Sequence, residues 1–227
     1  MQQTSYASSA EDLLVARYFP ADFVGTYVDV GCYKPVDYSN TYLFYQRGWR
    51  GLCIDAADYK ADYAAQRPGD TFVQSGVGVT PGTLTYYVIP EDPTSNTFDA
   101  RLVDAMRQHK GFTCIEQQVP VQPLSDILAA HPVERIDFLN IDIEGMDIGV
   151  LKAFDFNRYR PRVIAIEDLM LDLHNPMFSE TVAFLESKSY LFHSKAFFTA
   201  IFVDPRTPAE VELFKTADAN RGRLLKR

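Results

Sequence analysis

Short apolar runs alternate with helix-forming segments along this chain, and the alternation leaves few folds open to it. Strand-sized runs of mostly apolar residues lie at 27–30, 52–54, 136–141 and 163–166, with more polar stretches between them. Continuous apolar strands are typical of parallel sheets, because helices cover both faces of such a sheet. We therefore expect an α/β fold with a doubly wound, mainly parallel sheet.

Two strand-like runs close the pattern, at 190–193 and 197–203, with only 194–196 between them. A connection this short cannot hold a crossover helix, so the two runs should pair as a hairpin. This hairpin gives the predicted sheet an antiparallel edge strand.

A second hairpin is predicted in the middle of the chain. The runs 72–79 and 83–89 flank Thr80-Pro81-Gly82-Thr83, whose central proline and glycine suit a type II turn. After this hairpin we expect a polar loop, a helix over 100–108 and a further strand over 114–121.

We expect a single domain over residues 1–227, because no repeat or long linker divides the chain. It would carry an N-terminal helical extension over about 1–22 and a C-terminal helical tail over about 205–227. Ser8 and Glu11 have the spacing of a capping box, which predicts a short helix that ends near Phe19. The polar start of the chain lacks the basic and apolar regions of a secretory signal.

Composition excludes several function classes. With 22 basic against 30 acidic residues and a formal net charge of −8, the chain is a poor partner for nucleic acid, which binds Lys/Arg surfaces. No apolar run approaches the ~20 residues of a membrane span. A small-molecule or glycan substrate suits this charge better, and the sequence leaves a homo-oligomer open.

The three cysteines, Cys32, Cys53 and Cys114, form no CxxC motif and no cluster with histidine. A disulfide framework and a structural zinc site are therefore disfavoured. Reduced thiols point to the cytoplasm.

Acidic residues mark the ends of four predicted strands: Asp29, Asp55, Asp142 and Glu167. In open α/β sheets ligands bind in the crevice beyond the carboxyl ends of the strands. If the strands are parallel, all four carboxylates should face that crevice. The sequence thus predicts the working site at this edge.

The first of these strands ends in Gly31, which permits a sharp turn and close approach to a ligand. Asp55, at the end of the next strand, has the position of an acid that binds ribose hydroxyls in nucleoside-binding α/β folds, although it could instead cap the following helix. A dinucleotide site needs G-x-G-x-x-G, whereas the segment 31–35 holds one glycine. We therefore expect a cofactor with a ribose and no phosphates.

Two other function classes remain open. A non-catalytic binding module for nucleosides or glycans would keep the fold without catalysing transfer, and the presence of Asp29, Gly31, Asp55, Asp142 and Glu144 argues against it. A nicotinamide oxidoreductase is opposed by the missing glycines.

Three segments resemble signatures of the FkbM-type methyltransferases. The first begins with Tyr27-Val28-Asp29-Val30-Gly31-Cys32-Tyr33-Lys34-Pro35 and continues through Ser39-Asn40-Thr41, Arg47-Gly48-Trp49-Arg50-Gly51 and Ile54-Asp55-Ala56. The second is Ile136-Asp137-Phe138-Leu139-Asn140-Ile141-Asp142-Ile143-Glu144-Gly145, and the third runs from Arg160-Pro161 to Val163-Ile164-Ala165-Ile166-Glu167. Cys32 stands where alanine is usual, and Pro35 where many methyltransferases have another glycine.

The resemblance implies a class I methyltransferase fold with a seven-stranded, Rossmann-like sheet. It implies an S-adenosylmethionine-dependent O-methyltransferase that methylates a hydroxyl of a sugar, glycan or natural product. The residues it places at the cofactor are Asp29, Gly31 and Cys32 near the methionine and sugar portions, Asp55 and Ala56 at the ribose, Gly76 and Val77 near the adenine, and Asp142. Ser39 and Asn40 would cap the first crossover helix, whose amides could receive the cofactor's carboxylate.

Methyl transfer to a hydroxyl releases a proton, and a nearby base that accepts this proton speeds the reaction. We expect Asp142 or Glu144 to be this base. Glu167 is the second candidate, and Asp168 and His174 are weaker candidates. Carboxylates at these positions could also hold Mg²⁺ or Ca²⁺, which prefer oxygen ligands. Neighbouring strand ends gather acids for hydrogen bonding alone, so no metal is expected.

Overall fold

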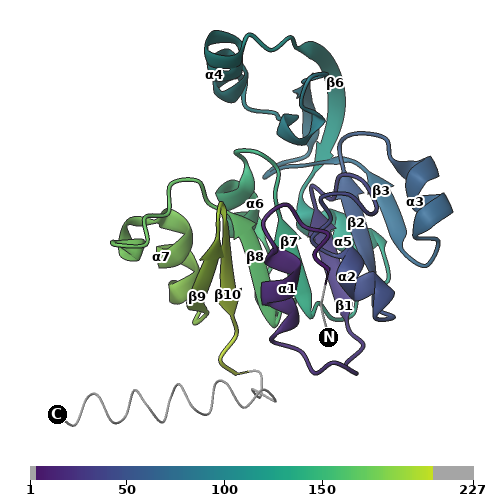
Figure 1. Cartoon of the computed structure of the whole chain (residues 1–227), viewed down its shortest axis with the longest axis vertical. Helices are drawn as coiled ribbons and strands as arrows, with labels where there is room; N and C mark the ends of the chain where they lie inside the picture. Colours follow the sequence, from purple (N-terminus) through teal and green to yellow (C-terminus); the bar gives the residue numbers. More distant parts are fainter. Residues whose placement is uncertain (1–3, 207–227) are drawn as a thin grey trace.

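The computed structural model describes residues 4–206. Its main feature is a seven-stranded sheet in the order β3-β2-β1-β7-β8-β10-β9 (Figure 1). The strands, in that order, are Thr71–Gln74, Arg50–Asp55, Thr26–Val30, Phe138–Ile141, Val163–Glu167, Thr199–Val203 and Leu191–Ala196. From β3 to β8 the strands are parallel, whereas β10 is antiparallel to both of its neighbours. The predicted α/β fold, with its mainly parallel sheet and antiparallel edge, is confirmed.

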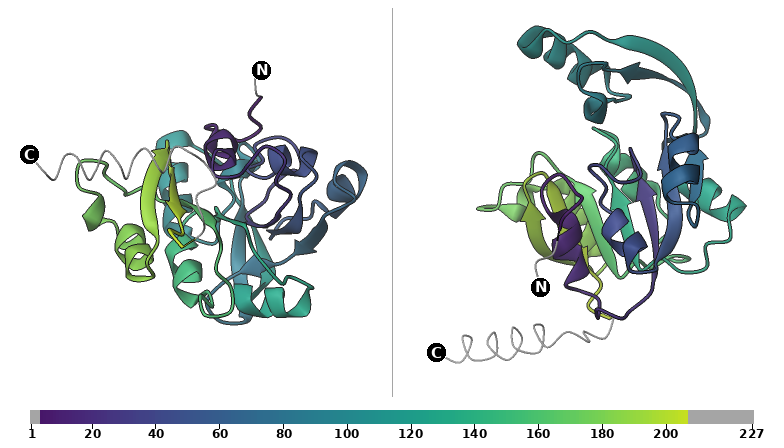
Figure 2. Two further views of the ribbon diagram at one scale, coloured as in Figure 1. Left: turned by 90° about the horizontal axis from the view of Figure 1, so that it is seen from below. Right: turned by 45° about the vertical axis from the view of Figure 1, so that its right-hand side comes forward.

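Helices cover both faces of this sheet (Figures 1 and 2). They are α1 (Glu11–Ala16), α2 (Tyr42–Gln46), α3 (Lys60–Gln66), α5 (Leu124–Ala130), α6 (Asp147–Ala153) and α7 (Glu180–Ser187). On one face, α1 and α2 pack an aromatic-rich core around Phe44, Trp49 and Phe138. On the other, α5, α6 and α7 pack an aliphatic core that includes Leu139 and Ile164. Burial from both sides explains why the central strands are apolar almost throughout.

A second, three-stranded sheet projects from the carboxyl edge of the first and curves over it (Figures 1 and 2). Its order is β4-β6-β5, with bounds Gly76–Val77, Ile115–Gln122 and Gly82–Val88. The 3₁₀ helix η1 (Pro93–Ser95) and the helix α4 (Ala100–Lys110) connect β5 to β6. We call residues 76–122, which hold these elements, the arm.

The predicted hairpin of 72–79 with 83–89 is wrong. β3 belongs to the main sheet, and the chain leaves that sheet at Ser75. β5 pairs antiparallel along its whole length with β6, which lies between β5 and β4. The longer β6 offers β5 more ladder hydrogen bonds than the two-residue β4 could, and this partner lies too far along the chain for a turn motif to reveal.

The first helix is shorter than predicted, since α1 ends at Ala16 and not near Phe19. Ser8 does not cap it, because the helix begins after Ala10, whose φ is 64°. Glu11 instead accepts a hydrogen bond from the Ser9 amide at 2.8 Å.

The C-terminal hairpin is confirmed, with β9 and β10 joined through Phe197 and Phe198. A second 3₁₀ helix, η2 (Pro176–Phe178), lies between β8 and α7. The predicted helical tail lies outside the described residues, apart from its first two. Within residues 4–206, no helix combines the length and apolar character needed to cross a membrane.

Candidate functional site

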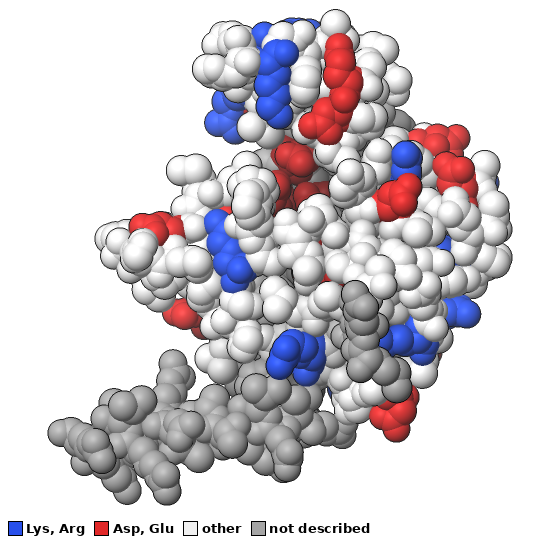
Figure 3. Space-filling model, viewed as in Figure 1, with Lys and Arg blue, Asp and Glu red and all other residues white. Residues whose placement is uncertain are grey.

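A cleft lies at the carboxyl ends of β1, β2 and β7, where the arm bends over the main sheet. It encloses about 510 Å³ of space, part of it open to solvent. Gly31, Asp55 and Asp142 line it from the sheet, and the arm contributes residues such as Tyr86 and Phe98. Figure 3 shows acidic side chains inside the hollow beneath the projecting arm. The cleft therefore has the position predicted from the strand ends.

Gly31 makes the turn at the floor of this cleft. Its φ is +78°, and a Cβ added to it would lie 1.7 Å from the carbonyl oxygen of Asp142. The Asp142 amide also donates to the Val30 carbonyl at 2.9 Å, which holds the two strand ends together. Only glycine fits this close approach of two backbones.

Asp55 joins the loop after Gly31 to the end of β2. Its Oδ2 accepts from the Tyr33 amide and its Oδ1 from the Ala57 amide, each at 2.8 Å. Burial raises the pKa of Asp55 to about 6 in spite of these hydrogen bonds. Asp55 does not cap the following helix α3, which begins at Lys60 and has Tyr59 at its N-cap.

Ala56, Gly76 and Val77 also line the cleft, as their predicted positions near a cofactor require. Beside them lie aromatic and polar residues that the sequence analysis did not identify: Tyr33, Tyr59, Tyr86, Asn96 and Phe98. Tyr33 and Tyr59 are close in sequence to Gly31 and Asp55, and this proximity could have predicted that they line the cleft. The other three belong to the arm, where no motif marked them.

Three carboxylates converge beside the cleft, those of Asp142, Glu144 and Glu167. One oxygen atom from each lies within 4.8 Å of the others. Among residues 4–206, none of these carboxylates has a hydrogen bond or an ion pair. Burial, followed by repulsion from neighbouring carboxylates, raises the pKa values of Glu144 and Glu167 to about 8 and that of Asp142 well above its usual value. We call these three residues the acid cluster.

The backbone that carries Glu144 is held in place from two sides. Thr97, in the arm, donates its hydroxyl to the Glu144 carbonyl at 2.6 Å. Asp147 accepts from the amides of Ile143 and Gly145, at 2.9 and 3.0 Å. The fixed element in this loop is thus the main chain, while the Glu144 carboxylate stays available.

The acid cluster could coordinate a divalent cation, because carboxylate oxygens are the ligands that Mg²⁺ and Ca²⁺ prefer. The same groups could also accept a proton, since a carboxylate with a pKa near 8 is matched to proton transfer near neutral pH. A site that works without a metal stays a prediction.

Four predicted cofactor residues lie below the cleft surface: Asp29, Cys32, Ser39 and Asn40. The carboxylate of Asp29 does not line the cleft, unlike those of Asp55 and Asp142, because it accepts from Thr41 Oγ1 at 2.6 Å and Asn140 Nδ2 at 2.9 Å. Ser39 Oγ accepts from the amides of Thr41 and Tyr42. Those amides at the start of α2 are therefore already bonded.

The loop after β8 carries the remaining candidates away from the cleft. His174 is exposed and its amide donates to Asp172. Asp168 accepts from the Ser179 hydroxyl at 2.6 Å. Neither residue belongs to the acid cluster.

Comparison with known proteins identifies a family whose sequence model matches this chain. A sequence model described as the methyltransferase FkbM domain matches residues 29–192. The match extends from β1 into β9 and so includes the cleft, the arm and the acid cluster. No curated protein matches the chain.

Proposed function

The chain belongs to the FkbM methyltransferase family, and from this premise we propose that it is an S-adenosylmethionine-dependent O-methyltransferase. The acceptor is a hydroxyl of a sugar, glycan or natural product. One observation carries the proposal: a cleft lined by Gly31 and Asp55 adjoins three carboxylates that have no partners among the described residues. Nucleoside recognition and proton transfer would then take place side by side.

The cleft suits the nucleoside part of such a cofactor. Asp55 has two backbone partners and further lone pairs that can accept from ribose hydroxyls. Tyr33, Tyr59 and Phe98 supply flat apolar surfaces of the kind on which an adenine stacks. Gly31, which also lines the cleft, would bring backbone rather than a side chain against the rest of the cofactor.

S-adenosylmethionine would supply an activated methyl group at this edge of the sheet. The acid cluster would accept the proton that the acceptor hydroxyl loses as its oxygen bonds to the methyl carbon, while the bond from that carbon to sulfur breaks and S-adenosylhomocysteine leaves. Asp142 or Glu144 is the proposed base, and Glu167 completes the group that orients the hydroxyl. Such a base contributes about 10²–10⁴-fold to a rate, and alignment of the two reactants contributes further.

We place the reaction in the cytoplasm because all three cysteines are free thiols. The net charge of −8 supports a small-molecule or glycan acceptor over a nucleic acid. We further propose that the chain works as a single domain.

Calorimetric titration with S-adenosylmethionine, S-adenosylhomocysteine and, as a control, NAD tests the proposal. We expect micromolar binding of the first two ligands and none of NAD. Binding of NAD alone would support an oxidoreductase. A folded protein that binds S-adenosylmethionine but methylates no hydroxyl compound in a broad screen would support the non-catalytic binding module.

The Asp55→Ala variant locates the ligand within the cleft. Loss of one or two hydrogen bonds to the ribose should weaken S-adenosylhomocysteine binding by about 1–3 kcal/mol. An affinity equal to the parent's would remove Asp55 from the binding site.

A further inference from the structure

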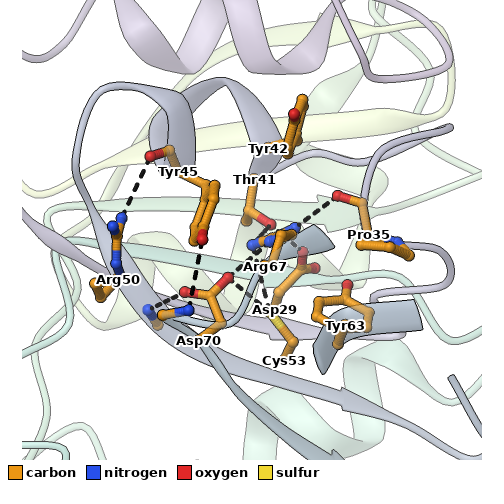
Figure 4. Close-up of polar contacts among 12 residues, drawn as sticks. Asp29, Pro35, Thr41, Tyr42, Tyr45, Arg50, Cys53, Tyr63, Arg67 and Asp70 are labelled. Atoms are coloured by element: carbon orange, nitrogen blue, oxygen red, sulfur yellow. Dashed lines mark hydrogen bonds and ion pairs between the residues drawn. The ribbon is translucent and has the colours of Figure 1, made fainter. Parts of the chain in front are cut away.

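Arg67, which follows α3 directly, is fully buried, and its guanidinium lies at the centre of the polar network in Figure 4. Each of its three nitrogens donates a hydrogen bond to the protein. Nε donates to Asp70 Oδ2 at 2.7 Å, and this ion pair has no exposed side-chain surface. A buried arginine with a complete set of partners is costly to build, since charge must be removed from water.

Half of the partners of Arg67 belong to one segment, the loop from Gly31 to Thr41 that connects β1 to α2. Nη1 donates to the Pro35 carbonyl at 3.1 Å and to Ser39 Oγ at 3.2 Å. Nη2 donates to Thr41 Oγ1 at 3.0 Å. We call residues 31–41 the β1–α2 loop.

The other partners belong to the frame of the sheet. Nη2 also donates to the Tyr27 hydroxyl at 2.8 Å, in β1, and lies 3.5 Å from Cys53 Sγ, in β2. Both oxygens of Asp70 accept from the Tyr27 hydroxyl, and Asp70 Oδ1 accepts from the Gly51 amide. The guanidinium therefore bridges the β1–α2 loop and two central strands.

The bridge extends to Asp29. Thr41 receives a hydrogen bond from Arg67 and donates its own to Asp29 Oδ2 at 2.6 Å. Burial raises the pKa of Asp29, and both the Thr41 hydrogen bond and the Arg67 charge oppose this rise. Arg67 thus supports the carboxylate at the end of β1 without touching it.

The opposite side of the same loop forms the cleft. Gly31 and Tyr33 line the cleft, and the Tyr33 amide binds Asp55. Two non-glycine residues with left-handed backbone, Tyr33 at φ 50° and Tyr38 at φ 60°, give the loop a path that its own sequence does not favour. Hydrogen bonds from residues outside the β1–α2 loop must therefore hold its backbone in this conformation.

We propose that Arg67 is the positioning residue that holds the β1–α2 loop in the shape that binds the cofactor. The inference rests on the proposed function, because it assumes that S-adenosylmethionine occupies the cleft. Only a guanidinium offers five planar N–H groups to a carbonyl, two hydroxyls, a phenol and a carboxylate at once; a lysine has one nitrogen. Arg67 would act entirely through the loop, since it does not line the cleft.

Titration calorimetry with S-adenosylhomocysteine separates positioning from simple support of the fold. Irreversible loss of the fold lowers the number of binding sites and leaves the Kd unchanged. Reversible unfolding raises the apparent Kd only when a measurable fraction of the free protein is unfolded, and circular dichroism of the same sample measures that fraction. A displaced loop raises the Kd at one site per folded chain. For Arg67→Lys we expect a Kd about tenfold higher, which is the size of effect expected from the loss of one hydrogen bond. The stoichiometry should stay at one site per chain.

Arg160→Lys is the matched control. Arg160 also pairs with a buried aspartate, Asp204, at 2.8 Å, and donates to the carbonyls of Lys188 and Ser189. It precedes β8 and so lies at the amino edge of the sheet, opposite the cleft. Its substitution should lower the melting temperature and leave the Kd within about twofold of the parent's.

A second pair of variants carries the test if Arg67→Lys fails to fold. Thr41→Val keeps the shape of the side chain and removes the hydroxyl that links Arg67 to Asp29, so the Kd should rise about fivefold. Thr41→Ser restores the hydroxyl and should bind within about twofold of the parent.

Unchanged Kd values in Arg67→Lys and Thr41→Val would overturn the proposal, as would an equal rise in Arg160→Lys. If the parent itself binds neither S-adenosylmethionine nor S-adenosylhomocysteine, the proposed function fails together with this inference. If the parent binds both and the variants bind equally well, only the inference about Arg67 fails.

Discussion

Two groups of charged side chains, the network around Arg67 and the acid cluster, differ in whether their charges have partners. Around Arg67, every charge has a partner: Asp70 is ion-paired, and Asp29 accepts two hydrogen bonds. In the acid cluster, three carboxylates face one another without a cation or a donor among the described residues. Partners offset the cost of removing a charge from water, whereas like charges in a partly buried site destabilise the fold.

The contrast indicates which group serves the structure and which serves the chemistry. A network whose donors and acceptors are all used has nothing left to offer a ligand. A group of unpaired carboxylates with raised pKa values has free lone pairs and holds protons near neutral pH. Such perturbed groups in a cleft are typical of functional sites.

The largest expected effect concerns the paired group. In Asp70→Asn the Arg67 guanidinium loses its buried counter-charge, and breaking such a pair costs about 3–5 kcal/mol of the free energy of unfolding. Urea denaturation followed by circular dichroism measures the loss. Asp204→Asn, in a more exposed ion pair, should cost less. Equal losses would mean that the network around Arg67 contributes no more to the free energy of unfolding than the Arg160–Asp204 pair does.

The next effect concerns catalysis by the acid cluster. Asp142→Asn should lower the turnover number about 100-fold, because the substitution removes a base, while the Kd for S-adenosylmethionine changes only a few-fold. Initial rates on an acceptor found by screening the parent measure this. Asp172→Asn, an exposed acid outside the cluster, is the control. Unchanged turnover would remove Asp142 from the catalytic residues.

The third prediction uses pH to test the cost of unpaired acids. The pKa of Glu144 is about 8 in the folded protein, raised from 4.5, so the folded state holds the proton more tightly than the unfolded state. The free energy of unfolding should therefore fall as pH rises from about 4.5 to 8 and level off above that range.

Glu144→Gln removes this titration. The variant should lose less stability across the same pH range and exceed the parent at pH 9 by about 1 kcal/mol. Thermal unfolding at several pH values provides the comparison. A variant with the parent's pH dependence would show that the Glu144 carboxylate is not under electrostatic strain.

The smallest expected effect is that of a chelator. If the acid cluster works as a base and holds no metal, EDTA should leave methyl transfer within about twofold of the untreated rate. The rate is measured before and after chelation and again after addition of Mg²⁺. A large loss that Mg²⁺ restores would assign the acid cluster to a cation.

Much of the fold followed from local signals. Apolar runs of strand length predicted the central strands, and the short connection predicted the terminal hairpin, although the turn lies at Phe197 and Phe198 and residues 194–196 belong to β9. The turn motif at Thr80–Thr83 predicted the wrong hairpin. β5 pairs with β6, which begins only after the helix α4. Local turn preference carries little weight against a long ladder of hydrogen bonds.

The candidate site was predictable to a similar degree. Strand-end position identified Asp55, Asp142 and Glu167, and the residue type identified Gly31. Strand-end position alone did not distinguish Asp29, whose carboxylate is buried in a network, from the acids beside the cleft. It also missed Arg67 and the aromatic residues of the arm, since their roles depend on partners remote in sequence.

The sequence by itself determined the strands, the acids at their carboxyl ends and the glycine that must turn at Gly31, because periodicity and backbone freedom are local properties. Only the tertiary structure decided which acids remain unpaired and which lie beneath the cleft. It alone placed Arg67 against the β1–α2 loop and brought Glu144 to Glu167. Whether a buried charge finds a partner depends on contacts between distant segments, and those contacts form only when the sheet and the arm assemble.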